Sequence, residues 1–229
     1  MNIRYRTPEW LKYALTYFYI IIYILSLAGI LYFNGFLLFL CCVIFIYSGV
    51  IIALQVHAIL HGHFHKNRRF NEFLASFILF LNGPITYNAI RRKHLDHHKY
   101  FGTDKDPDNL RANSVFDFWY RIMMSYKEKW TIVLNIIGVL LLSFFSKKSW
   151  FVLFLIIVVS KSLTALLVAS FGGYLPHQTK FNEKIIPKWF CYIISIGNMY
   201  HLEHHKYPHL YSLDLSITEE QTNSNLKYK

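Results

Sequence analysis

The chain has 229 residues, of which 54% are hydrophobic and only 16% are charged, and its formal net charge is +11. The chain has too few polar residues to cover the surface of a soluble domain of this size. Its basic residues flank apolar runs, whereas in nucleic-acid-binding domains they spread over a soluble fold. The composition therefore excludes an ordinary soluble protein and a nucleic-acid partner. It favours a membrane protein whose basic residues lie against an anionic leaflet.

The N-terminal part holds two long apolar runs, at about 13–33 and 36–60, separated by the turn residues Asn34 and Gly35. Each is long enough to cross a bilayer, which takes about 20 apolar residues in a helix. We expect the pair to form a transmembrane hairpin. A third run, at about 73–90, is interrupted by Asn82-Gly83-Pro84, and we expect it to lie along the membrane interface.

Two further candidate spans follow, at about 130–145 and at about 150–175, the second with Lys161 in its middle. A last, weaker apolar stretch covers about 185–200. The sequence thus predicts an all-α integral membrane protein with four transmembrane helices, interfacial helices and a cytoplasmic cap. We expect one domain over residues 1–212 and a flexible polar tail over 213–229.

The basic residues predict the orientation of these spans. With the N-terminus inside, only Lys147 and Lys148 lie outside and Lys161 lies within a span, which leaves 21 of the 24 Lys and Arg residues (24 − 2 − 1) on the cytoplasmic side. Such a bias obeys the positive-inside rule. The same orientation places every histidine at or beyond the cytoplasmic helix ends.

Eight of the 12 histidines fall into three spaced clusters, or boxes. The boxes are His57 and His61; His94, His97 and His98; and His201, His204 and His205. Spacings of three and four residues turn side chains toward one side of a helix. We therefore expect all three rings of a triplet to face the same way and eight imidazoles to gather at one membrane face.

Imidazole is a good ligand for iron, zinc, copper and nickel, and eight ligands exceed the needs of one ion, so the boxes predict two metals. Asp96 and Glu203 lie inside the two triplets; they either orient ligand rings through hydrogen bonds, act as direct ligands, or are solvated acids. Glu203 directly precedes His204, which excludes the HExxH pattern of zincins. No catalytic residue separate from the metal centre is expected.

The three boxes read His57-Ala-Ile-Leu-His61, His94-Leu-Asp-His97-His98 and His201-Leu-Glu-His204-His205. They resemble the histidine boxes of the membrane fatty-acid desaturase superfamily. The connecting segments 102–108 and 171–177 resemble those of its carotenoid ketolase branch. The resemblance implies two iron ions held by the eight box histidines, with His177 as a ninth ligand. Asp104, Asp106 and Asp108 either orient the metal ligands from behind or are merely part of a proline-containing turn.

The resemblance implies an O2-dependent oxidoreductase that acts on CH2 groups of a long hydrocarbon, a carotenoid above all. Electrons are expected from a separate, ferredoxin-type protein, and the basic residues around 66–69 and 91–93 either dock it or anchor the chain at the membrane. A fatty-acyl desaturase is the alternative. A membrane metal transporter would place its ligands near mid-bilayer instead, and a catalytically dead metal sensor has no support because all eight box histidines are present.

Overall fold

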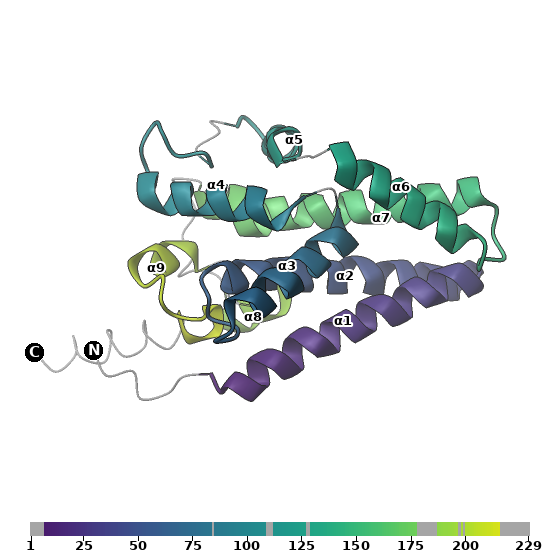
Figure 1. Ribbon diagram of the computed structural model, residues 1–229, viewed down its shortest axis with the longest axis horizontal. Coiled ribbons are helices and arrows are strands. Elements are labelled where there is room, and N and C mark those ends of the chain that lie inside the picture. Colours follow the sequence, from purple (N-terminus) through teal and green to yellow (C-terminus); the bar gives the residue numbers. More distant parts are fainter. Residues whose placement is uncertain are drawn as a thin grey trace, which may run out of the picture.

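The computed structural model describes residues 7–83, 85–108, 112–126, 129–177, 187–196, 198 and 200–215, and within these ranges the regular elements are all helices. The predicted all-α class is confirmed. In chain order, the helices are α1 (Glu9–Tyr32), α2 (Gly35–Leu60), α3 (Arg68–Asn82), α4 (Tyr87–Tyr100), α5 (Val115–Tyr126), α6 (Lys129–Ser143), α7 (Trp150–Ala169), the π-helical turn η1 (Ser170–Tyr174), the 3-10 turn η2 (Leu175–His177), α8 (Lys188–Ser195) and α9 (His201–Lys206) (Figure 1).

Within the described residues, three helices are long and apolar enough to cross a membrane: α1, α2, and α7 continued by η1. Their 24 to 26 residues correspond to about 36–39 Å of helix, which exceeds the ~30 Å hydrocarbon core of a bilayer. Large apolar side chains on their outer faces are exposed and have the character of a lipid-facing surface. Examples are Phe18, Ile21, Leu25, Phe36, Phe39, Phe151, Leu155 and Val159.

The hairpin between α1 and α2 turns tightly at Asn34 and Gly35, as predicted. Gly35 has a φ of +56°, a left-handed conformation that glycine adopts without strain. Gly29 on α1 allows close approach of the two helices, because a Cβ added there would collide with the sulfur of Cys41 on α2.

The turn that precedes α7 lies against the α1–α2 turn. The Ser146 hydroxyl donates to the Leu31 carbonyl at 3.1 Å, and the Lys148 ammonium donates to the Phe33 carbonyl at 2.6 Å. Figure 1 shows both turns at one end of the molecule, whereas α4, α9 and the C-terminal end of α2 lie at the other. The two loops that the sequence assigned to one side of the membrane therefore share one end of the fold.

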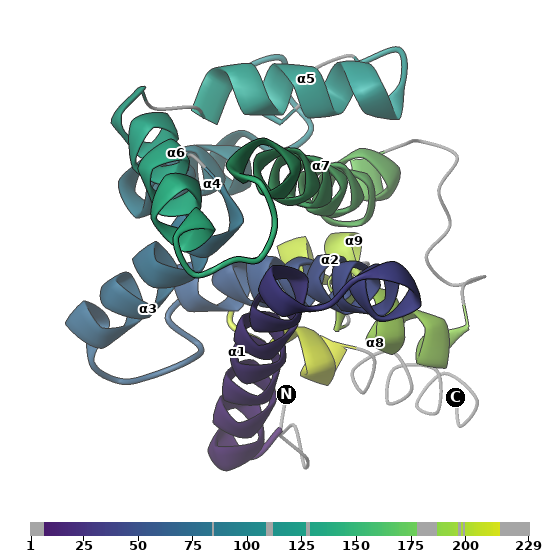
Figure 2. The same ribbon diagram turned by 90° about the vertical axis from the view of Figure 1, so that its right-hand side faces the viewer.

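The expected fourth span, at about 130–145, forms α6, which has 15 residues. Its length is about 22 Å, less than that of the three long helices. α6 packs beside α7, and α5 lies across both helices in the end-on view of Figure 2.

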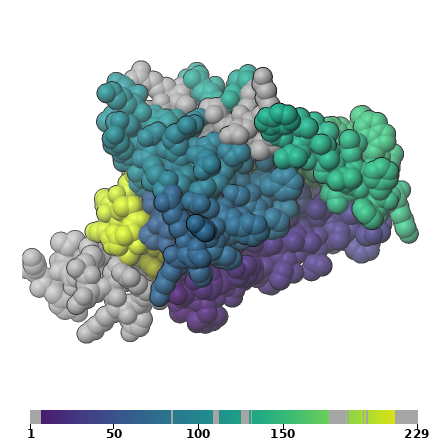
Figure 3. Space-filling model, viewed as in Figure 1, coloured from purple at the N-terminus to yellow at the C-terminus, as the bar shows by residue number. Residues whose placement is uncertain are grey.

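The apolar run at about 73–90 is divided where the sequence predicted. α3 ends at Asn82, and α4 begins only at Tyr87, after Thr86 has capped it by accepting a hydrogen bond from the Ala89 N–H. This interruption lets the chain reverse and place the basic, histidine-bearing α4 over the helix ends. In Figure 3, α3 and α4 form the blue and teal front surface above α1.

The main core lies between α1, α2, α3 and α7. Ile30, Ile52, Ala75, Ile78 and Leu153 are completely buried there, and such close apolar packing fixes the directions of the four helices.

A second, smaller core lies under α8 and α9 and includes Cys191, Tyr200, Leu210 and Leu215. Residues 213–215, which the sequence assigned to the flexible tail, belong to this packed region. Asp214 is buried and accepts a hydrogen bond from the backbone N–H of Thr7 at 2.7 Å. The rest of the predicted tail, 216–229, lies outside the described residues.

Candidate metal centre

The three boxes are carried by three elements that meet at one end of the molecule. His57 lies in the last turn of α2, and His61 is its C-cap. His94, His97 and His98 lie along α4, and His201, His204 and His205 make up half of the short α9. The predicted gathering of the eight box histidines at one end is present in the structure.

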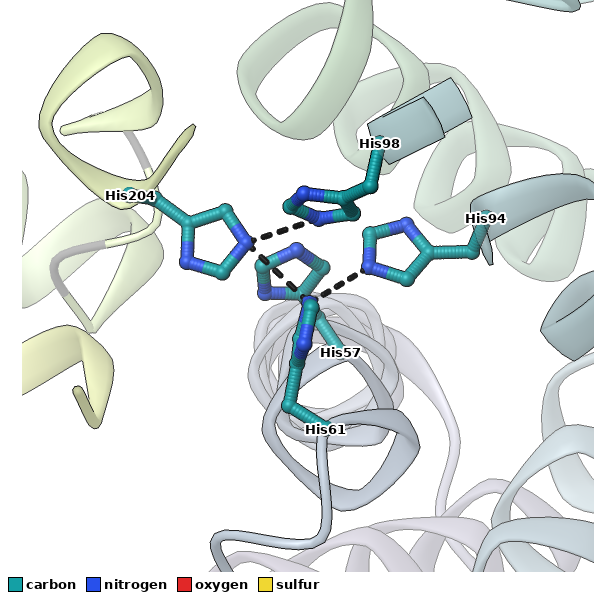
Figure 4. A group of neighbouring side chains, drawn as sticks. All are labelled: His57, His61, His94, His98 and His204. Atoms are coloured by element: carbon teal, nitrogen blue, oxygen red, sulfur yellow. Dashed lines mark hydrogen bonds between the residues drawn. The ribbon is translucent and has the colours of Figure 1, made fainter. Parts of the chain in front are cut away.

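Five of these imidazoles form one group, drawn in Figure 4: His57, His61, His94, His98 and His204. Their candidate ligand nitrogens all lie within 4.8 Å of one another. Nε2 of His61 is 2.7 Å from Nε2 of His94 and 3.1 Å from Nε2 of His204. Nε2 of His204 is also 3.1 Å from Nε2 of His98. The rings converge from α2, α4 and α9, so three elements close this group.

The other three imidazoles, His97, His201 and His205, form a second group. Nε2 of His97 lies 2.9 Å from that of His205 and 3.3 Å from that of His201, and the last two are 3.0 Å apart. On its other side, Nδ1 of His97 lies 2.7 Å from Oδ1 of the buried Asp106. The ring of Phe101 is stacked on His205, with centroids 3.7 Å apart.

These spacings suit two metal ions. Two imidazole nitrogens bound at right angles, with metal–nitrogen bonds of about 2.1 Å, lie about 3.0 Å apart, and the observed nitrogen separations are 2.7–3.3 Å. Hydrogen bonds alone do not explain this convergence, because one shared proton joins only two nitrogen atoms at a time. A cation at the point where the rings converge would accept a lone pair from every ring.

The electrostatics of the site keep these rings neutral. Burial and the nearby His98 and His63 lower the pKa of His61 to about 3, and burial and His97 lower the pKa of His98 to about 4. Burial, followed by the neighbouring imidazoles, also lowers the pKa of His94 and of His204. Neutral imidazole is the form that binds metals, so at pH 7 these lone pairs are available.

The structure distributes each triplet between the two groups, which differs from the prediction that the three rings of a box share one side. His94 and His98 belong to the group of five, whereas His97 belongs to the group of three. In box three the division is reversed, with His201 and His205 in the group of three and His204 in the group of five. Residues four apart share a helix face, whereas the remaining histidine of each box points about 60° away from the first of them and about 100° away from the second.

Four of the candidate acids occupy different environments. Asp106 contacts His97, as described above. Asp96 and Asp104 are exposed, and the carboxylate of Glu203 accepts a hydrogen bond from Lys206 at 2.7 Å. The ninth candidate ligand, His177, lies in η2, and its side chain is outside the described residues.

An apolar cavity of about 500 Å³ adjoins the histidines. His57, His94 and His201 form part of its wall, and the cavity continues between α2, α3, α5, α6 and α7 past mainly aliphatic and aromatic side chains. A cavity of this size and character is typical of a site for a small lipid or another apolar molecule.

Two further contacts belong to this region. Asp108, which the sequence grouped with Asp104 and Asp106, approaches His97, with 3.8 Å between Oδ2 and Nδ1, and it also lines the cavity. Lys161 donates a hydrogen bond to the side-chain amide oxygen of Asn135 at 2.6 Å. The two lie 26 positions apart, on α6 and α7, so no local pattern indicates their contact.

The helices and histidine groups define a helical membrane-type protein with two groups of side chains that could hold metal ions. Residues 31–127 match the fatty acid desaturase family. The chain is similar to a beta-carotene 4-ketolase from Protosiphon botryoides, at 25% identity over 72% of this chain and 46% of the relative. A zeaxanthin 4-ketolase from Chlamydomonas reinhardtii is 26% identical over 72% of this chain and 40% of the relative.

A beta-carotene ketolase from Paracoccus sp. (strain PC1) is 26% identical over 75% of this chain and 74% of that relative. The chain spans less than half the length of the two algal relatives. No solved structure matches it. The match of residues 31–127 to the fatty acid desaturase family, together with the similarity to carotenoid ketolases, confirms the resemblance found in the boxes and connecting segments.

Proposed function

We propose that this chain is a membrane di-iron oxidoreductase that uses O2 to oxidise CH2 groups of a long hydrocarbon, with a carotenoid as the favoured substrate. The observation that carries the proposal is the meeting of two convergent imidazole groups with the inner end of an apolar cavity. Three curated ketolases among its relatives support the carotenoid assignment.

The proposed ligands are the eight box histidines, five in one group and three in the other, with His177 as a ninth. Iron bound there would supply the chemistry that activates O2 and oxidises carbon. The neutral imidazoles would hold the ions, and Asp106 would fix the ring of His97 through Nδ1. The apolar wall excludes water and presents a hydrocarbon to the histidine end of the cavity.

The proposed topology has four spans, with α6 as a short fourth helix beside α7. The histidine end faces the cytoplasm and the N-terminus lies inside, which the Lys and Arg distribution supports. The end with the α1–α2 and α6–α7 turns then faces outward. A separate electron carrier delivers electrons from the cytoplasmic side.

A fatty-acyl desaturase remains the second candidate because the same cavity would accept an acyl chain and the family match is to fatty acid desaturases. The metal-transporter hypothesis is weaker, since the eight box histidines lie at one end of the fold and not midway along the spanning helices, where transporters place their ligands.

Two measurements test the proposal together. The purified chain is analysed for iron, and it is expressed in one bacterial host that makes β-carotene and in another with ordinary phospholipids only. We expect two irons per chain and a gain of oxygen on the carotenoid by mass spectrometry. Loss of two hydrogens from an acyl chain would instead establish a desaturase, and a chain that purifies with neither iron nor another transition metal would refute the metal assignment.

A further inference from the structure

Lys161 lies in the middle of a membrane-spanning helix. It is eleven residues from the start of α7 at Trp150, which is about 17 Å along the helix axis. A lysine side chain does not reach the membrane surface over that distance. An ionisable residue at such depth is costly unless it has a partner or a function.

The ammonium group of Lys161 is incompletely paired by the described protein atoms. It has three N–H donors, and one of them bonds to Oδ1 of Asn135 at 2.6 Å. Among the described residues, no carboxylate lies within ion-pair distance of Lys161. The contact with Asn135 ties α6 to α7 but leaves the positive charge without a counter-ion in that part of the chain.

Lys161 and Asn135 both line the cavity, together with apolar neighbours such as Ile136, Val139 and Ile157. A second donor in this wall, the indole N–H of Trp119, is buried and has no hydrogen-bond partner among the described residues. Buried donors without acceptors are uncommon in folded proteins. An occupant that supplies an oxygen atom would satisfy them.

The register of α2 and α7 gives the distance between this lysine and the histidines. Gly49 and Thr164 lie opposite one another, since a Cβ added to Gly49 would be 3.1 Å from the Thr164 side chain. His57 is eight residues beyond Gly49, and Lys161 is three residues before Thr164, in helices that run the same way. With 1.5 Å per residue, His57 and Lys161 are about 17 Å apart along the axes.

We propose that the cavity binds a single-chain lipid that carries an oxygen at one end, and that Lys161, oriented by Asn135, holds this oxygen in the part of the cavity farther from the histidines. The bound molecule is an amphiphile with its polar end at mid-membrane and a carbon about 17 Å away at the imidazoles. That this carbon is the one oxidised rests on the proposed function; the anchoring by Lys161 does not.

Two sources share this chemistry: a saturated fatty acid or alcohol, and a polyene acid or alcohol of the length of a retinoid. An intact hydrocarbon carotene has no oxygen to offer Lys161 and would occupy the cavity without this anchor. The probes below separate the saturated chain from the polyene.

The test is equilibrium binding to the purified full chain in detergent, read by displacement of the fluorescent polyene parinaric acid. The competitors are palmitic acid, the alcohol and alkane of the same chain length, and retinoic acid. For the unmodified chain, we expect at least one of the two acids to bind about tenfold or more tightly than the alkane, as a charge-assisted hydrogen bond provides. The acid that binds more tightly identifies the source.

Substitutions test whether Lys161 causes the preference for acids over the alkane. Lys161→Met should weaken acid binding about tenfold or more and leave alkane binding unchanged, whereas Lys161→Arg should retain the preference. Lys147→Met, which removes an exposed lysine near the start of α7, is the matched control and should bind like the unmodified chain. Ala165→Phe fills the cavity and should weaken acid and alkane alike.

Equal binding of acids and alkane by the unmodified chain would overturn the proposal. So would a Lys161→Met chain that is less heat-stable but binds acid normally, because Lys161 would then only tie α6 to α7. Unchanged binding in Ala165→Phe would show that the ligand lies elsewhere. Binding is measured without turnover, so a failure to detect oxidation would count against the proposed function and leave the anchoring intact.

Discussion

Asp106→Asn is the substitution that tests the three-histidine group most directly. The Asp106 carboxylate is buried and lies 2.7 Å from Nδ1 of His97, and it also accepts a hydrogen bond from the Asp108 N–H at 2.9 Å. Asparagine keeps an oxygen that can accept both bonds but removes the negative charge. A hydrogen bond to a charged group contributes about 1.5–3 kcal/mol, which corresponds to about 10- to 100-fold in an equilibrium constant.

We therefore expect Asp106→Asn to weaken metal binding at the three-histidine group by about 10- to 100-fold and to leave the five-histidine group loaded. The assay is an anaerobic Fe(II) titration in competition with a chelator, in which the unmodified chain fills two sites and the variant fills one at limiting metal. Asp96→Asn, on the exposed side of α4, is the control. Two tight sites in Asp106→Asn, or the same loss in Asp96→Asn, would refute the role given to Asp106.

Three other substitutions test the remaining parts of the structure. His204→Ala should remove metal from the five-histidine group and abolish activity while membrane insertion survives, and metal analysis should show no such loss for the exposed His209→Ala; near-normal turnover in His204→Ala would contradict the ligand assignment. Gly29→Ala should destabilise the α1–α2 hairpin by about 1–3 kcal/mol, and Cys41→Ala should relieve most of this in a double-mutant cycle of detergent unfolding; additive effects would exclude the contact. Tyr211→Phe removes a buried hydrogen bond to a glutamine on α2 and should lower the unfolding free energy by about 1 kcal/mol, with no change in unfolding indicating that the bond is not formed.

The helical class, the α1–α2 turn and the division of the run at 82–84 follow from local signals in the sequence, and the structure agrees with them. Apolar length, turn residues and a helix-breaking proline act over a few positions, so a single sequence contains them in full. The clustering of histidines follows from helical spacing in the same way. The length of α6 is less predictable, because helix ends depend on the packing of neighbouring elements.

What sequence alone could not assign is the partition of each box between the two groups. That partition depends on how α4 and α9 face one another across the end of α2, and their contacts join residues more than 100 positions apart. The positions of the aspartates also depend on how distant parts of the chain pack. Asp96 lies inside a box and is exposed, whereas Asp106 lies in the following loop and reaches His97. Proximity in sequence is a poor guide to proximity once a loop folds back onto a helix.

The crossed division of boxes two and three has a consequence for how the protein matures. α9 has six residues, too few for a helix that is stable by itself, yet it provides one imidazole to one group and two to the other. Before this C-terminal segment docks, the newly made chain offers four of the five ligands of one group and a single ligand of the other. If both groups bind metal as proposed, metal binding and docking of this C-terminal segment are coupled. A chain cut before residue 200 would then lack ligands of both sites, and a shortage of metal would leave α9 less stably docked.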